Sequence, residues 1–328
     1  MSTDPFRICR TALKNTVALA TLLAVSACAV QVGTSGVPAA DSAEIAPGDR
    51  DRAMGFPAAE GNRSEGNRSL GAPELPDLFG LPRTISLAAD FADLRARMGG
   101  RMGMAIMPVG GGEVTALGDW STGIAWSTIK VPIALAALRR DPDGLIDTAE
   151  AAITFSDNGA AQQLWNSLGT SEEAATAVES VLREAGDTVT DIADRHTRLA
   201  TVGSYELMAF GATSWTLTDQ VRFASRLPCL DDADTVISLM GEITPDQSWG
   251  LGRLIGAEFK GGWGPDDDTG DYTVRQFGLI PTLSGPIAVA MAAEPGSGSF
   301  SDATDMMDRM ALLVADHLEE LRGGRCMH

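Results

Sequence analysis

The chain has 328 residues and a formal net charge of −19, from 25 basic and 44 acidic side chains. This acidic balance excludes a nucleic-acid-binding protein that neutralises phosphates with a basic surface. With 44% hydrophobic residues, the chain can bury a packed core and is too apolar to be wholly disordered. No apolar run reaches the roughly 20 residues that cross a bilayer, so we predict no membrane-spanning helix.

The N-terminus has the order of charge and hydrophobicity of a bacterial export signal. Three basic residues within 1–15 precede the apolar stretch TVALATLLAVSA at 16–27, which is too short to span a bilayer. The residues VSAC that end at Cys28 resemble the lipobox of bacterial lipoproteins, whose cysteine carries lipid. A plain cleaved signal with an incidental cysteine is the alternative. We expect 1–27 to be a signal peptide and Cys28 to be lipidated. The protein would then be exported and held on the outer face of the cell membrane by lipid alone.

Residues 28–81 are rich in Ala, Gly, Ser, Pro and Asp, include the tandem repeat GNRSEGNRS, and show no lasting helical or strand period. We predict a flexible linker. Beyond it, Cys229 and Cys326 are the remaining cysteines. In an oxidising compartment they would form a disulfide that ties the C-terminal tail, 323–328, to a loop. Two free thiols are the alternative, and the sequence alone does not decide the geometry.

The folded domain is expected over 82–322, and hydrophobic periodicity predicts its elements in chain order. A helix at 85–98 precedes a hairpin with strands at 101–109 and 113–120. Helices follow at 124–140, 156–168, 171–185 and 216–227. Strands at 253–262, 273–280 and 286–294 and a helix at 302–321 complete the domain. This order predicts an α+β fold with an antiparallel sheet of about five strands built from both chain ends. Terminal helices would flank the sheet, with an all-helical subdomain inserted between its two halves.

Lysine is rare in this chain, with three residues against 22 arginines, and only Lys130 and Lys260 lie beyond the export signal. A buried lysine can become a neutral amine, whereas arginine keeps its proton near neutral pH. Ser127 stands three residues before Lys130, which places both on one face of the predicted helix. A desolvated amine there could take the hydroxyl proton and make the serine a nucleophile. A histidine-based triad is disfavoured, because His196 is the only histidine outside the last twelve residues.

Two further motifs carry groups that suit the same chemistry. Ser156-Asp157-Asn158 stands at the head of a predicted helix, where it would also serve as an N-terminal cap. Lys260-Gly261-Gly262-Trp263 lies in a predicted strand. Its glycines would let a substrate approach the backbone, or would simply mark a bulge, and its Trp could be a packing residue.

In this order the three motifs resemble the S-x-x-K, S-D-N and K-T-G motifs of the serine β-lactamase and penicillin-binding-protein superfamily. Residues 156–187 are especially similar to class A β-lactamases. The resemblance implies that Ser127 is acylated, that Lys130 is its base, that Ser156 relays the proton and that Asn158 binds the substrate amide.

The resemblance also implies how a substrate would be held. Lys260 would attract a substrate carboxylate beside Gly262, and the backbone N–H groups of Ser127 and Trp263 would stabilise the oxyanion. Arg275 lies in the next predicted strand, where class A enzymes often place an arginine that binds the carboxylate. An exposed strand charge is the alternative for Arg275.

The chain departs from the family pattern at two places. Gly261 replaces the threonine of the third motif, and 191–210 lacks the E-x-x-L-N pattern that supplies the deacylating glutamate, with Glu206 its only glutamate. We therefore expect acylation to outpace hydrolysis of the acyl-enzyme. The acidic residues at 266–268 and 271 lack a full ligand spacing and predict a solvated turn, so neither metal nor cofactor is expected.

We expect the substrate to be a β-lactam or a cell-wall peptide-like molecule, with no nucleic-acid partner. The alternatives are a D-Ala-D-Ala-type peptidase or transpeptidase and a non-catalytic binding lipoprotein of the cell envelope. The sequence does not indicate an oligomeric state.

Overall fold

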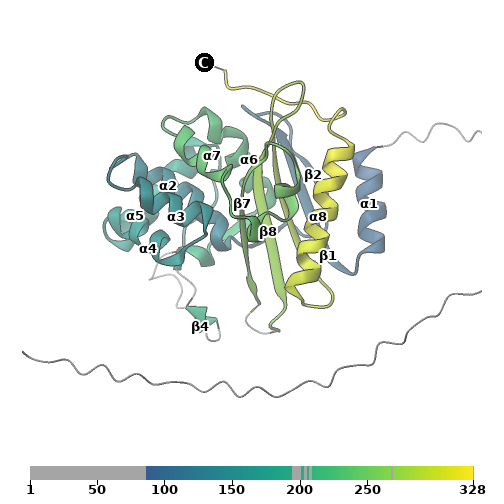
Figure 1. Ribbon diagram of the computed structural model, residues 1–328, viewed down its shortest axis with the longest axis horizontal. Helices are drawn as coiled ribbons and strands as arrows, with labels where there is room; N and C mark the ends of the chain where they lie inside the picture. Colours follow the sequence, from purple (N-terminus) through teal and green to yellow (C-terminus); the bar gives the residue numbers. More distant parts are fainter. Residues whose placement is uncertain (1–85, 194–200, 203–204, 207–208, 267–268, 328) are drawn as a thin grey trace, which may run out of the picture. The chain divides into compact units, whose positions relative to one another are not determined.

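The structure, a computed structural model, describes residues 86–193, 201–202, 205–206, 209–266 and 269–327 (Figure 1). The expected export signal and linker, including Cys28, lie outside these residues, as does His196. Within the described ranges, no helix combines the length and apolar character needed to cross a bilayer.

A five-stranded antiparallel sheet in the order β2-β1-β9-β8-β7 forms the centre of the domain. Strands β1 (Gly100–Pro108) and β2 (Thr115–Gly118) come from the start of the domain, and β7 (Glu258–Pro265), β8 (Tyr272–Ile280) and β9 (Ile287–Pro295) come from its end. The two halves join where β1 pairs with β9, from Gly100 opposite Pro295 to Pro108 opposite Ile287. This confirms the predicted α+β class and the sheet built from both chain ends.

Helices cover both faces of the sheet (Figure 1). On one face, α1 (Leu87–Arg97) and α8 (Phe300–Asp316) pack over an apolar cluster that includes Phe91, Met291 and Met307. The other face carries a helical block, which packs over a second apolar cluster. The helical block consists of α2 (Lys130–Leu138), α3 (Ile146–Thr154), α4 (Asn158–Ser167), α5 (Ser171–Glu184), α6 (Leu217–Arg226) and α7 (Asp234–Met240).

Five of these helices begin at the kind of capping residue that satisfies a free backbone N–H of the first turn. The caps of α1, α4, α5, α6 and α8 are Ser86, Asp157, Thr170, Thr216 and Ser299. Helix α5 starts where predicted, and the other four start within two residues of their predicted positions. Helices α3 and α7, which are short, were not predicted.

The helix predicted over 124–140 is the largest departure in the first half of the domain. The structure instead has strand β3 (Thr122–Ile124), paired with β6 (Ser214–Thr216), and then the 3-10 turn η1 (Trp126–Ile129) before α2. Trp126 has a φ of 51°, a left-handed conformation that a right-handed helix cannot contain. The α-helix therefore begins only at Lys130, and Ser127 lies on the preceding turn.

The strand predicted from residue 253 begins instead at Glu258. The 3-10 turn η5 (Gly250–Arg253) precedes it, and Gly256 turns the chain with a φ of 74°. At the C-terminus, α8 ends at Asp316, five residues before the predicted end. The small strands β4 (Thr201–Val202) and β5 (Tyr205–Glu206) form a separate hairpin.

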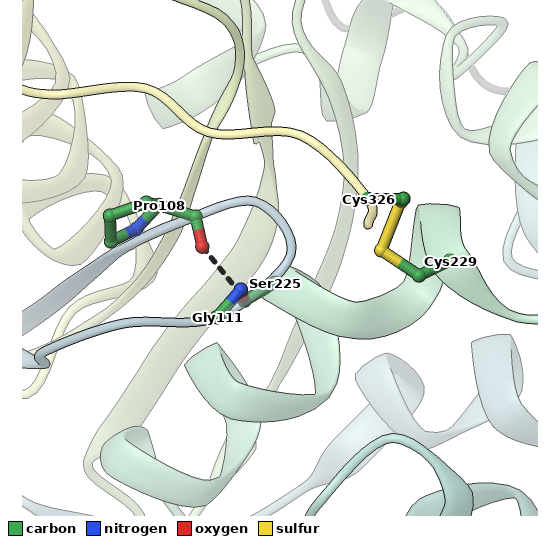
Figure 2. The surroundings of a disulfide bond; sticks show 5 residues. All are labelled: Pro108, Gly111, Ser225, Cys229 and Cys326. Carbon is green, nitrogen blue, oxygen red and sulfur yellow. Dashed lines mark hydrogen bonds between the residues drawn. A yellow bond between two sulfur atoms is a disulfide. The ribbon is translucent and has the colours of Figure 1, made fainter. Parts of the chain in front are cut away.

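The disulfide between Cys229 and Cys326 is present, with a Cα–Cα distance of 5.3 Å (Figure 2). Cys229 lies in the 3-10 turn η3 (Leu227–Cys229), directly after α6. Next to it, Ser225 on α6 donates its hydroxyl to the Pro108 carbonyl at 2.5 Å and accepts the Gly111 N–H at 3.1 Å. The bridge thus ties the C-terminal tail to the end of α6, which also holds the turn of the first hairpin.

Candidate active site

Ser127 lies on the tight turn η1 between β3 and α2. The Thr128 hydroxyl donates to the Ala125 carbonyl at 2.5 Å, and the Lys130 N–H donates to the carbonyls of Ser127 and Thr128. From 126 to 130, Ser127 is the one residue that is not buried. The left-handed Trp126 before it is costly for a bulky residue, and such strain is typical of functional turns. The turn therefore buries the residues on either side and leaves Ser127 partly exposed.

The glycines of β7 make room for this turn. A Cβ added to Gly262 would lie 2.8 Å from the Ser127 nitrogen and 3.0 Å from the Ala125 oxygen, and one added to Gly264 would collide with the Trp126 ring. The chain's own turn thus fills the space that a side chain at 262 would take, and the substrate-binding role expected for Gly262 stays a prediction. Gly262 lets the backbone at Ser127 lie against the edge strand β7.

The Lys130 amine is buried and contacts the second motif. Its Nζ donates to the Ser156 carbonyl at 2.6 Å and to Asn158 Oδ1 at 2.7 Å, and lies 3.4 Å from Ser156 Oγ. In the described part of the chain, no hydrogen bond joins Lys130 Nζ to Ser127 Oγ, although one was expected. The amine is within one helical turn of the serine but is held by the residues around Ser156.

The second motif divides its functions among its three residues. Asp157 caps α4, because its Oδ1 accepts the Ala160 N–H at 2.6 Å. Ser156 has a φ of 56°, a second left-handed residue at this site. This backbone conformation leaves both oxygens of Ser156 directed to Lys130, so the motif caps a helix and also holds the amine.

Lys260 reaches the same serine from strand β7. Its fully buried Nζ donates to Ser156 Oγ at 2.9 Å and to the Gly261 carbonyl at 2.9 Å. The Ser156 hydroxyl therefore lies between two lysine amines from different elements. The three motifs, distant in sequence, meet at this oxygen.

Burial changes the proton affinity of both amines. It lowers the pKa of Lys130 to about 7, against the opposing effect of Asp157, and it lowers the pKa of Lys260, an effect that Lys130 reinforces. A neutral amine has two N–H donors and one lone pair. In neutral Lys130 the donors would serve Ser156 O and Asn158 Oδ1, and the lone pair would remain to accept a proton, including that of the Ser156 hydroxyl at 3.4 Å.

Arg275 is neither exposed nor directed to a substrate, and both of our interpretations of it were wrong. It is fully buried, and its guanidinium donates to the backbone carbonyls of Gly123, Ile124 and Trp215. The register between β7 and β8 explains why Arg275 is buried here. Arg275 lies opposite Gly262, and the turn η1 occupies the space beside Gly262.

The Trp263 side chain lies on the face of the sheet that α1 and α8 cover, away from Ser127. Its ring lies 5.9 Å from that of Trp249 and 5.8 Å from that of Phe300 at the start of α8. Trp249 also covers Gly261, where a Cβ would lie 3.1 Å from its ring. The Trp263 side chain is thus a packing residue, and an oxyanion role for this residue involves only its backbone N–H.

Two other predictions concern loops. The expected lack of a deacylating carboxylate in 191–210 remains a prediction, because most of that segment and the Glu206 side chain lie outside the described residues. Asp266 and Asp271 lie in the β7–β8 turn, where the Asp266 N–H donates to the Asp271 carbonyl at 2.7 Å. The described residues include no group of His, Cys, Asp and Glu side chains arranged to hold a metal ion.

No protein-family model and no curated protein matches this sequence. Solved structures do match it. A class A β-lactamase from Mycobacterium abscessus aligns with a TM-score of 0.55 and 19% identity over 71% of this chain and 100% of its own. An ancestral class A β-lactamase aligns with a TM-score of 0.54 and 20% identity over 70% and 99%. An extended-spectrum β-lactamase aligns with a TM-score of 0.58 and 15% identity over 71% and 98%. The chain has the class A β-lactamase fold, as the motifs implied.

Proposed function

We propose that this chain is an exported, lipid-anchored serine hydrolase that forms an acyl-enzyme on Ser127 with a β-lactam or a related amide. The observation that carries the proposal is the convergence of Lys130 and Lys260 on the Ser156 hydroxyl beside the turn of Ser127. An uncharged amine, a relay hydroxyl and an accessible serine are the groups that acyl transfer without histidine needs. The solved structures of the same fold include proteins that are titled class A β-lactamases.

Acylation would begin with transfer of the Ser127 hydroxyl proton to the Lys130 amine. The serine oxygen forms a bond to the substrate carbonyl carbon, and the negative charge moves to the carbonyl oxygen. The N–H groups of Ser127 and Trp263 would bind that oxyanion. We propose that the Lys130 amine turns to Ser127 when substrate is bound, since catalytic hydrogen bonds often align only in that complex.

Collapse of the intermediate requires a proton on the leaving nitrogen. Ser156 would donate its hydroxyl proton to that nitrogen and recover one from protonated Lys130, whose Nζ lies 3.4 Å from the Ser156 oxygen. Lys260 donates to the same oxygen at 2.9 Å and so fixes the direction in which the Ser156 hydroxyl proton points. The net result is an acylated serine, a cleaved C–N bond whose nitrogen has become an amine, and a neutral Lys130. With a β-lactam this amine stays tethered to the acyl group, and with an open-chain amide it leaves.

Hydrolysis of the acyl-enzyme needs an activated water molecule. The family's glutamate pattern is missing from 191–210, so we propose slow turnover with a persistent adduct. A peptidase or transpeptidase would share the acylation step and differ only in the molecule that removes the acyl group.

Incubation of the protein with a fluorescent penicillin, followed by mass spectrometry of its peptides, tests the proposal. We expect one adduct on Ser127 and none in Ser127→Ala. With a chromogenic cephalosporin, we expect the protein to release the hydrolysed product slowly. Transfer of the acyl group to an added D-amino acid would instead favour the transpeptidase. Absence of any adduct on Ser127 with penicillins, cephalosporins and D-Ala-D-Ala depsipeptides would contradict the proposal and favour a binding lipoprotein.

The anchor is tested separately in cells that express the whole chain. We expect wild-type protein in the membrane fraction with fatty acid on Cys28, and Cys28→Ala in the soluble exported fraction. Membrane retention of Cys28→Ala would contradict the lipid anchor and leave the active-site proposal intact.

A further inference from the structure

We propose that Arg275, Gln220 and Thr128 form a buried positioning network that sets the geometry of the Ser127 turn. The proposal rests on the proposed function, since its effect is on acylation of Ser127. All three side chains are fully buried, and none is a residue to which the motifs assign a chemical step.

A continuous series of hydrogen bonds joins the three residues to the turn. Arg275 Nη2 donates to Gln220 Oε1 at 2.8 Å, Gln220 Nε2 donates to Thr128 Oγ1 at 3.0 Å, and Thr128 Oγ1 donates to the Ala125 carbonyl at 2.5 Å. Gln220 lies on α6 and Arg275 on β8, so the series spans three elements of the fold.

The direction of the series follows from chemistry at its first member. A guanidinium only donates, so the Gln220 amide must turn its oxygen to Arg275 and its NH₂ group to Thr128. Thr128 Oγ1 therefore accepts from Gln220, and its own hydrogen is left for the Ala125 carbonyl. The arginine thus fixes the orientation of an amide and a hydroxyl that could each otherwise reverse.

Arg275 also fixes the strand that leads into the turn. Its Nη1 donates to the carbonyls of Gly123 at 3.1 Å and Ile124 at 3.0 Å, directly before Ala125. Its two Nη atoms both lie 3.1 Å from the Trp215 carbonyl on the partner strand β6. The arginine therefore holds both strands of the small β3–β6 sheet at the point where the chain enters η1.

Burial of the Arg275 guanidinium lowers the stability of the fold, so we expect it to have a compensating role. In the described part of the chain, no carboxylate pairs with Arg275, whose guanidinium lies 5.3 Å from the centre of the Trp120 ring. Burial lowers the pKa of Arg275 to about 9, so it keeps its charge at neutral pH. A buried cation without a counter-ion costs stability. We infer that the fold tolerates this loss of stability because the contacts of Arg275 maintain the turn in which Trp126, one residue before the nucleophile, is left-handed.

The consequence is a specific effect on the bond-forming step. If the turn relaxes, the Ser127 oxygen and N–H shift relative to the bound carbonyl, and a displacement of about 1 Å at a reacting group costs roughly 100-fold in rate. Binding of the probe before the reaction depends on other parts of the site. The network should therefore affect the acylation rate constant and leave the dissociation constant of the initial complex nearly unchanged.

Gln220→Glu separates positioning from simple stabilisation. A carboxylate at 220 gives Arg275 a counter-ion but cannot donate to Thr128, so the Thr128 hydroxyl turns to the carboxylate and releases the Ala125 carbonyl. We expect the melting temperature to stay at or above the wild-type value while the acylation rate constant falls about 10- to 100-fold. Thr128→Val should lose a similar factor, and Thr128→Ser should retain most of the rate.

Ser225→Ala is the matched control, because Ser225 is also fully buried on α6 and bonds across to another segment, the β1–β2 turn. It should lose stability and keep the wild-type acylation rate constant. Stopped-flow measurement with a fluorescent penicillin gives both constants for each variant. Wild-type acylation by Gln220→Glu, or an equal loss in Ser225→Ala, would overturn the network proposal while the Ser127 adduct still supports the proposed function.

A second measurement does not depend on acylation. Hydrogen exchange of a peptide that covers 120–130 should be faster in Gln220→Glu than in wild type and Ser225→Ala, with no change in α8 peptides. Unchanged exchange at 120–130 would overturn the network. If wild-type protein forms no adduct but this exchange difference appears, the proposed function fails and the positioning network stands.

Discussion

The two faces of the central sheet bury different kinds of side chain. The face under α1 and α8 is filled largely by apolar groups, among them Met102, Met104 and Met307. The face toward the helical block also buries Lys130 and Lys260, whose amines contact hydroxyl, amide and carbonyl oxygens. Burial of a lysine amine without a carboxylate partner costs stability, because it either desolvates the charged form or forces the loss of a proton, whereas apolar burial supplies stability. We infer that apolar burial on both faces stabilises the fold and that only the face toward the helical block also carries the chemistry.

Lys130→Arg should give the largest effect on the site. The guanidinium cannot lose its proton near neutral pH, so it cannot accept the Ser127 proton. We expect acylation by a fluorescent penicillin to slow by about 1,000-fold, within the range for loss of a general base. Acylation within tenfold of wild type, with the fold retained by circular dichroism, would show that Lys130 is not the base.

Met307→Ala should affect the opposite face alone. Met307 is fully buried under α8, and truncation of such a side chain costs about 2–5 kcal/mol of unfolding free energy. We expect that loss in urea unfolding, with an acylation rate constant equal to that of wild type at a temperature where both variants are folded. A parallel loss of acylation would remove the division between the two faces.

His317 should give a smaller and pH-dependent effect. Burial tends to lower its pKa, but hydrogen bonds with Glu320 at 2.9 Å and Asp90 at 3.0 Å, and the charges of both, raise it above its usual value. A raised folded-state pKa contributes stability below the unfolded-state pKa, and that contribution is lost as pH rises through the folded value.

His317→Gln should therefore lower the melting temperature more at about pH 5.5 than at about pH 8.5. Thermal unfolding of both proteins in matched salt gives the comparison. An equal loss of melting temperature at both pH values would indicate that packing determines the contribution of His317 to stability, and not its ion pairs with Asp90 and Glu320.

The sequence was sufficient to predict the sheet and the groups that meet at Ser156. Apolar periodicity located all five strands of the main sheet, and the motifs located Lys130 and Lys260. These features were predictable because they depend on local pattern and on residue types with few other uses.

The details of the site depend on contacts between distant segments, and there sequence reasoning failed. The left-handed turn at Trp126 exists because Gly262 and Gly264 admit it against β7. The position of Arg275 depends on the register between β7 and β8 and on carbonyls from β3 and β6. A signal was present in the alternating glycines at the end of the third motif and directly after it, since Gly262 and Gly264 face the same side of one strand.

The pH dependence of acylation tests the central claim, that Lys130 acts as an uncharged amine. Its pKa of about 7 means that the neutral form increases through that pH. The acylation rate constant should rise about tenfold per pH unit below the midpoint and reach a plateau above it. The residual rate of Lys130→Arg should lack this inflection. A wild-type profile that is flat through pH 7, or that rises only near the ordinary pKa of lysine at about 10.4, would contradict the account.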